Sequence, residues 1–139
     1  MNGLADSDSL RRWWQEHSEL DGLVEAVEEM LASGRLVRAR QAVADLEGVL
    51  DAHFAAEERV YFPLIERLSP DHRGSVQAAS GSHRKIGELV DGLADLVERG
   101  QLAGARRALE LLLERFRAHE SEEVRLIEDL EALESLSGE

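Results

Sequence analysis

The sequence predicts an all-α protein: an up-down-up-down antiparallel four-helix bundle built from a duplicated helical hairpin. Three observations support this fold class. Leu, Ala, Glu and Arg dominate the 139 residues and aromatic residues make up only 4%, a composition that favours helices over sheets. Apolar residues recur at intervals of three and four along most of the chain. The first half of the chain also aligns with the second half without a gap.

The first two helices are expected from apolar spacing and from helix-ending residues. One helix should cover about residues 10–31, after a cap at Ser7 or Asp8, and Gly34 should end it because glycine accepts the left-handed conformation that follows many helices. The second should run from about 36 to 68. Together these two helices form the first expected hairpin.

The second helix contains a proline, and a turn-rich segment separates it from the third. Pro63 should bend the last turn of the second helix, because it has no backbone N–H to donate. Residues 69–75, SPDHRGS, predict a loop. The third helix should span about 76–98, Gly100 should break the chain, and the fourth should span about 103–133. Connections this short make neighbouring helices antiparallel.

A shift of 66 residues relates the two halves. Residues 17–59 then align with 83–125, with 13 identities in 43 positions. Shared periodicity alone would match some Leu and Ala, so the shared histidines, glutamate and turn glycine carry the interpretation. The chain is therefore expected to be one domain, residues 1–139, made of two hairpins at about 8–68 and 74–134.

The charge and composition exclude several classes of protein. A net charge of −13 argues against nucleic acid and anionic membranes as partners. The absence of cysteine excludes disulfides, thiolate metal sites and iron–sulfur clusters. No apolar run approaches the roughly 18 residues of a membrane span, and the opening residues MNGLADSDS have no signal-peptide core. We expect a cytoplasmic protein that is a monomer or a weak homodimer.

Four of the five histidines belong to the repeat. His17 and His53 are 36 residues apart, as are His83 and His119. In each hairpin the two histidines lie 17 and 19 residues from the turn glycine. At 1.5 Å per residue both are then roughly 25–28 Å from the turn, at one level of the bundle. The spacing predicts that four imidazoles converge in one layer.

Two glutamates join this layer. Glu57 and Glu123 follow His53 and His119 by four residues, and residues four apart share one face of a helix. Buried imidazoles and carboxylates require compensation, which a metal ion supplies. A nitrogen and oxygen donor set without sulfur suits Fe, Mn or Zn, and two carboxylates between pairs of histidines suit a binuclear centre in which each carboxylate bridges the ions.

These residues resemble the hemerythrin-like (HHE cation-binding) domains. The resemblance rests on His17, on HFAAEERVYFP at 53–63, and on His83 followed by HESEE at 119–123, and it covers nearly the whole chain. It implies two iron ions bridged by carboxylates and by an oxo or hydroxo group. The implied metal ligands are the terminal His17, His53, His83 and His119 and the bridging Glu57 and Glu123. Residues 54–56 then form a one-turn spacer. Ferritin-like bundles use Glu-x-x-His, and no histidine here has a Glu three residues before it.

The chain departs from the oxygen-carrying members of that family at two positions. Gly87 stands where the carriers have a further histidine, and Val124 stands where they have an aspartate, so that Glu123 takes over. The ligand set is more similar to that of di-iron proteins of iron-centre repair and of NO or peroxide handling. We expect a partner such as O2, NO or H2O2. The alternatives are a sensing module or oxygen carrier without turnover, and a zinc-filled or metal-free interaction protein.

Several residues near the expected ligands leave alternatives open. Glu58 and Glu120 are solvated, hydrogen-bonded to a ligand, or ligands themselves. Asp21 is an extra ligand, an outer acceptor or a surface charge. His72 has no repeat mate and is expected in an exposed loop.

Three aromatic residues near the expected ligands also have alternative roles. Trp13 and Trp14 should pack in the core or an interface, or close the bundle above His17. Tyr61 is either a core residue or a hydrogen-bond donor to a bridging group or bound ligand.

Overall fold

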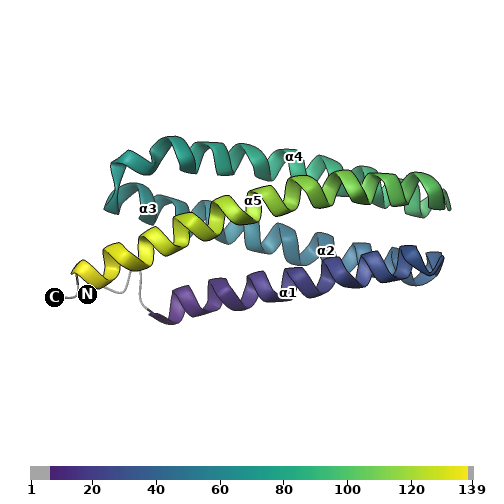
Figure 1. Cartoon of the computed structure of the whole chain (residues 1–139), viewed down its shortest axis with the longest axis horizontal. Helices are drawn as coiled ribbons and strands as arrows, with labels where there is room; N and C mark the ends of the chain where they lie inside the picture. The colour runs from purple at the N-terminus through teal and green to yellow at the C-terminus, as the bar shows by residue number, and fades with distance from the viewer. Residues whose placement is uncertain (1–6, 138–139) are drawn as a thin grey trace.

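A computed structural model describes residues 7–137, and helices account for nearly all of them, with no strand in that range. Four long helices lie side by side along the longest axis of the molecule (Figure 1). The elements are α1 (Ser7–Ala32), α2 (Leu36–Ala56), the π-helical segment η1 (Glu57–Tyr61), α3 (Phe62–Leu68), the 3-10 turn η2 (Pro70–His72), α4 (Arg73–Glu98) and α5 (Leu102–Ser137). The prediction of an all-α helical bundle is confirmed.

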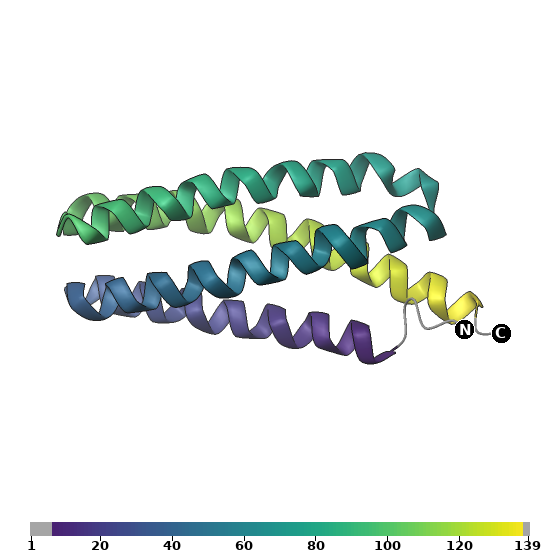
Figure 2. The ribbon, with the colours of Figure 1, turned by 180° about the vertical axis from the view of Figure 1, so that it is seen from behind.

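Two glycine turns end α1 and α4. Gly34 and Gly100 have φ values of +72° and +73°, in the left-handed region that glycine adopts without a steric penalty. At each turn the residue after the glycine donates a backbone hydrogen bond to the carbonyl five residues earlier, from Arg35 to Met30 at 2.9 Å and from Gln101 to Leu96 at 3.0 Å. Both turns lie at one end of the molecule, and the α3–α4 connection lies at the other (Figures 1 and 2). The two glycines therefore end α1 and α4 and form the turns to α2 and α5, at the positions expected from the sequence.

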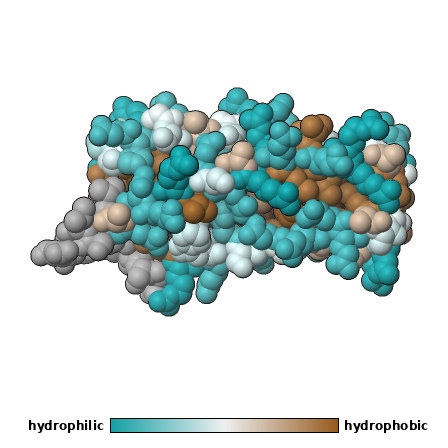
Figure 3. Space-filling view, viewed as in Figure 1, coloured by the Kyte–Doolittle hydropathy of each residue, from teal (hydrophilic) through white to brown (hydrophobic). Residues whose placement is uncertain are grey.

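Two apolar clusters fill the interior. One occupies the half nearer the glycine turns, and its buried members on α1 run from Leu20 to Leu31. The other occupies the opposite half and includes Trp13, Tyr61 and Leu130. The buried polar residues come between the two clusters along each helix, as His17 does between Trp13 and Leu20. The surface is mostly hydrophilic, with a hydrophobic strip on the half nearer the glycine turns (Figure 3).

The second expected helix, 36–68, is interrupted. Residues Glu57–Tyr61 are π-helical, and the backbone N–H of Phe62 bonds to the carbonyl of Glu57, five residues earlier. Pro63 explains part of this, because it offers no N–H and in an α-helix its ring would press on the carbonyl of Arg59. Its effect therefore begins upstream, at Glu57, rather than in the last turn.

The loop expected at 69–75 is much shorter. Ser69 is the single residue between α3 and the 3-10 turn, and α4 already starts at Arg73 rather than at residue 76. The expectation that His72 is a freely exposed loop residue is wrong. Its ring nitrogens contact the Ser69 hydroxyl at 2.6 Å and an Asp129 carboxylate oxygen at 2.9 Å. This segment is held against α5.

No helix in the described part of the chain combines the length and apolarity needed to cross a membrane.

The first prediction concerns the glycine turns. Gly34→Ala should lower the free energy of unfolding by about 1–2 kcal/mol, because an L side chain is strained at φ +72°. Gly22→Ala is the matched control: position 22 lies within α1, with no described atom within 4 Å of an added Cβ. It should raise stability by about 0.5–1 kcal/mol. Urea denaturation followed by circular dichroism measures both, and equal effects would contradict the assignment of strain.

Candidate metal centre

The six expected ligands come together in the buried layer between the two apolar clusters. Their exposed fractions range from 0% for Glu57 to 8% for His83. They form two groups that share both glutamates, and within each group the potential ligand atoms lie within 4.8 Å of one another. The groups are His17, His53, Glu57 and Glu123, and Glu57, His83, His119 and Glu123. Each of the four long helices contributes a histidine.

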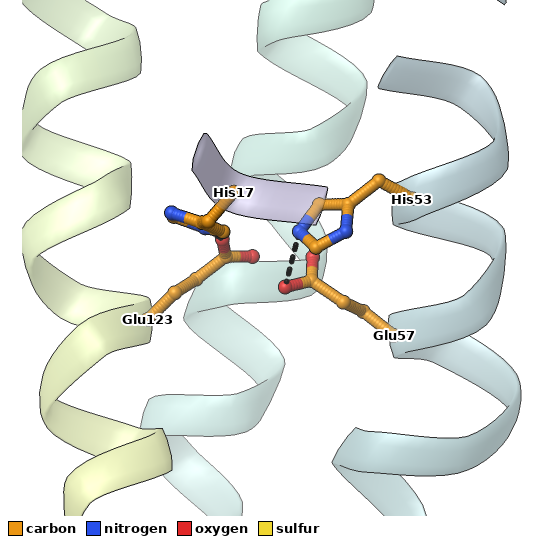
Figure 4. Close-up of side chains that lie close together, drawn as sticks. All are labelled: His17, His53, Glu57 and Glu123. Carbon is orange, nitrogen blue, oxygen red and sulfur yellow. Dashed lines mark hydrogen bonds and ion pairs between the residues drawn. The ribbon is translucent and has the colours of Figure 1, made fainter. Parts of the chain in front are cut away.

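Glu57 faces both hairpins. Its Oε2 lies 3.1 Å from Nε2 of His53 in its own hairpin, and Figure 4 shows the two side chains meeting between the helices. Its Oε1 lies 2.9 Å from Nε2 of His83 in the other hairpin. The two oxygens of one carboxylate therefore serve different pairs of histidines.

Glu123 has the corresponding arrangement from α5. Its Oε1 lies 3.2 Å from Nε2 of His17 in the first hairpin. Its Oε2 lies 3.0 Å from Nε2 of His83 and 2.6 Å from Nε2 of His119 in the second hairpin. Each of the two carboxylates thus directs one oxygen to the histidines of the first hairpin and the other oxygen to those of the second. Carboxylates that bridge two ions require this arrangement.

The π-helical segment brings two consecutive glutamates to the same imidazole. Glu57 contacts Nε2 of His83 at 2.9 Å, and Glu58 contacts Nδ1 of the same ring at 2.7 Å. Ser80 donates a further hydrogen bond to Glu58 at 2.9 Å. Single π-helical turns inside α-helices commonly occur at functional sites. Here the irregular turn carries both carboxylates that contact His83 from the α2 side.

Carboxylates also contact the outer nitrogens of three histidines. The pairs are Glu16 with Nδ1 of His53 at 2.9 Å, Glu58 with Nδ1 of His83 at 2.7 Å, and Glu120 with Nδ1 of His17 at 3.2 Å. An Nδ1–H that donates to a carboxylate leaves the Nε2 lone pair free to point into the centre. Of the alternatives for Glu58 and Glu120, hydrogen bonding to a histidine is the one found. Glu16 was not anticipated, because its contact is made across two helices and no sequence spacing signals it.

Aromatic side chains complete the surroundings of the centre. Trp13 is fully buried, stacks on His17 with ring centroids 4.0 Å apart, and donates its indole N–H to Oε2 of Glu57 at 2.8 Å. Phe54 stacks on His83 with centroids 3.8 Å apart and an interplanar angle of 10°. Phe54 is therefore more than the spacer expected from the sequence, and Trp13 closes the centre over His17.

The remaining candidates lie around this core. Asp21 hydrogen-bonds Glu120 and belongs to neither ligand group. Its partial burial and the neighbouring Glu120 raise the pKa of Asp21 to about 6. Tyr61 is buried in the apolar cluster away from the glycine turns. Trp14 is 36% exposed and donates to Glu131 at 3.2 Å, on the surface.

Nearby carboxylates determine the direction in which the pKa values of His17 and His83 shift. Burial lowers the pKa of His17, but hydrogen bonds with Glu120 and Glu123 outweigh burial and raise it to about 9. Burial likewise lowers the pKa of His83, but the nearby carboxylates of Glu123 and Glu57 outweigh burial and raise it to about 9. The neighbouring carboxylates therefore favour the protonated form of both imidazoles.

The carboxylates of Glu57 and Glu123 have opposite pKa shifts. Burial raises the pKa of Glu57, and the adjacent Glu123 adds to this. Burial also opposes ionisation of Glu123, but the imidazoles of His119, His17 and His83 in contact with it lower its pKa well below the usual range. Of the two carboxylates, Glu123 therefore ionises more readily than Glu57.

Unsatisfied buried atoms indicate that the residues fit a metal ion. Among the described residues, four buried side-chain atoms have no hydrogen-bond partner of adequate geometry: Nε2 of His53, Oε1 of Glu57, and both ring nitrogens of His119. Buried polar atoms without partners are costly and rare. Three of these four face the other members of the two groups. Cations between them would satisfy these atoms, and the nitrogen and oxygen donors suit Fe, Mn or Zn.

The fold and the site define a class of protein: a helical bundle whose buried histidines and carboxylates are arranged to hold cations. The family described as Hemerythrin HHE cation binding domain matches residues 8–130 of the 139. The chain belongs to this family. Comparisons with curated proteins and with solved structures gave no match.

The second prediction is a pH dependence of the metal-free protein. In the folded state His17 and His83 have pKa values of about 9, against an ordinary value of 6.5 that applies when the chain is unfolded. The folded state then binds more protons between these values, so the stabilisation is complete below pH 6.5 and is lost as pH rises through 9. Each group contributes at most about 1.4 kcal/mol per pH unit in that window.

Thermal unfolding of the metal-free protein at a series of pH values tests this expectation. The unfolding temperature should fall between pH 6.5 and 9.5, and His17→Gln should flatten the slope. His72→Gln, a histidine substitution outside the centre, should not. An unfolding temperature that stays constant across this range would contradict the assigned hydrogen bonds.

Proposed function

We propose that this protein is a non-haem di-iron protein that reacts with a small diatomic molecule or peroxide, namely O2, NO or H2O2, and that it turns this molecule over rather than carrying it. The arrangement of Glu57 and Glu123 carries the proposal, because each directs one oxygen to the histidines of each hairpin. The proposal includes the up-down-up-down order of the helices and the duplication of the hairpin, which bring the two carboxylates into the same layer.

The residues divide between two ions. His17 and His53 would hold one ion, His83 and His119 would hold the other, and the two glutamates would bridge them. A bound iron pair supplies electrons by cycling between ferrous and ferric states, chemistry that the side chains alone do not offer. The protein's part is to hold the imidazoles in place, to keep their Nε2 atoms directed inward, and to limit access to the centre.

Position 87, beside His83, leaves room for a side chain that the sequence does not supply. Gly87 follows His83 by one helical turn, and a Cβ added there would meet no described atom within 4 Å. Its mate in the repeat is Asp21, which reaches Glu120 on the other side of the centre. The first hairpin thus fills this position with a hydrogen-bonded carboxylate and the second leaves it open. An open coordination position is typical of reactive metal sites.

Aromatic rings restrict what can enter. Phe54 and Phe62 both stack near His83, with centroids 3.8 Å and 5.4 Å from its ring. A surface depression lined by His17, Asp21 and Glu120 approaches the centre from the α1–α5 side. These boundaries suit molecules of two or a few atoms and exclude bulky substrates. A centre surrounded by apolar groups also strengthens electrostatic interactions inside it.

The third prediction tests the bridging carboxylates. Glu57→Ala and Glu123→Ala should each reduce the iron content below two per chain and lower the unfolding temperature of the metal-loaded protein, because metal binding is coupled to folding. Glu122→Ala is the matched control, since Glu122 is exposed and adjoins Glu123. Metal analysis by mass spectrometry and thermal unfolding measure the effects. Two irons per chain in both variants would refute the bridging roles, and wild-type protein that retains zinc but not iron would refute the choice of metal.

The fourth prediction tests the open position. Gly87→His should add an imidazole beside His83, slow the consumption of peroxide or NO by the reduced protein, and prolong reversible uptake of O2. Gly92→His is the control on the same helix, because position 92 is also open but exposed. Stopped-flow absorbance follows the reactions.

Two results would contradict this part of the proposal. Reduced wild-type protein that binds O2 reversibly, and reacts with neither peroxide nor NO, would indicate a carrier. A Gly87→His variant with unchanged rates and spectra would show that the position is not open to ligands.

A further inference from the structure

The four histidines of the centre are unequally supported at their outer nitrogens. Nδ1 of His17, His53 and His83 each contacts a carboxylate, at distances of 2.7–3.2 Å. Nδ1 of His119 is buried and has no hydrogen-bond partner among the described residues. Because the His119 side chain is only 1% exposed, bulk water does not substitute for the missing partner. The difference is confined to one histidine of the second hairpin.

The repeat shows where the missing partner would have been. Glu16 precedes His17 on α1 and contacts His53 on α2. The shift of 66 residues places Ser82 at the corresponding position, before His83 on α4. A serine side chain is two carbons shorter than glutamate and carries no charge. The second hairpin therefore has the same histidines as the first but lacks the carboxylate that supports the second of them.

Outer carboxylates affect how well a histidine binds a cation. A carboxylate that accepts the Nδ1–H fixes the tautomer with Nε2 unprotonated, holds the ring in orientation and makes Nε2 more basic. His119 has none of these effects. If Nδ1 of His119 carries the proton, a buried N–H is left without an acceptor, which is costly. If Nε2 carries it, the ring cannot bind a cation through that atom.

We propose that the two cation sites of this centre differ in affinity and that the residues at positions 16 and 82 set the difference. The site of His17 and His53 fills first and retains its ion. The site of His83 and His119 fills second and loses its ion first. The inference rests on the proposed binding of two cations, and it makes Glu16 a positioning residue that acts through His53. The weaker site is also the one next to Gly87. The ion that would have room for a further ligand is therefore the ion that is lost first.

Titration of the metal-free protein with Co(II) tests the proposal, because visible absorbance of Co(II) reports each site independently of iron chemistry. Wild-type protein should show two binding steps whose affinities differ by roughly 10–100-fold, the usual effect of an outer carboxylate. Ser82→Glu should tighten the second step by that factor and bring the two steps together. Glu16→Ser, the reciprocal change, should weaken the first step by the same factor. Ser75→Glu, on the exposed part of α4, is the matched control and should leave both steps unchanged.

Nitrogen NMR of the imidazoles in zinc-loaded protein gives a readout that a general loss of stability would not change. The Nδ1 signal of His119 should move toward the position of the three supported histidines in Ser82→Glu. Two equal steps in the wild type, or unequal steps that neither substitution alters, would overturn the proposal. Should Ser82→Glu fail to fold, as judged by circular dichroism, an unaltered first step in Glu16→Ser would overturn it. Wild-type protein that binds no Co(II) and no iron would instead refute the proposed function.

Discussion

Burial of six ionisable side chains in one layer is the constraint on which the rest of the structure depends. Four imidazoles and two carboxylates between apolar clusters are tolerated only when they neutralise one another or hold cations. Every long helix must place its histidine at the same distance along the bundle. The turns at Gly34 and Gly100 make this possible because both lie at the same end of the molecule. The apolar residues on either side then exclude the water that would otherwise weaken these contacts.

The layer is itself held by a ring of neighbours. Glu16, Glu58 and Glu120 orient three imidazoles, while the indole N–H of Trp13 orients Glu57. The supporting residues differ between the two hairpins much more than the six central ones do. The six inner residues thus match between the two halves of the repeat, while the residues that contact their outer atoms differ.

The sequence predicted those features that depend on distance along a single helix. Apolar spacing predicted the four long helices, and matched distances from Gly34 and Gly100 predicted that four histidines share a level; Glu57 and Glu123 followed from a spacing of four. Their role as metal ligands stays a prediction. Features that depend on the angle between helices were not predictable. The stacking of Phe54 on His83 and the reach of Glu16 to His53 belong to this group. Pro63 signalled a disturbance but not its position, because the π-helical turn forms where the helix can widen, upstream of the proline.

The carboxylate contacts between hairpins have a consequence for how the centre depends on protein concentration. Glu57 reaches His83, and Glu123 reaches His17, so neither hairpin contains a whole centre. A single hairpin of half this length could build the centre only by pairing with a second copy of itself, at a rate and yield set by its concentration. The short connection at Pro70–His72 replaces that encounter by an intramolecular one. Dilution therefore does not separate the two halves of the site.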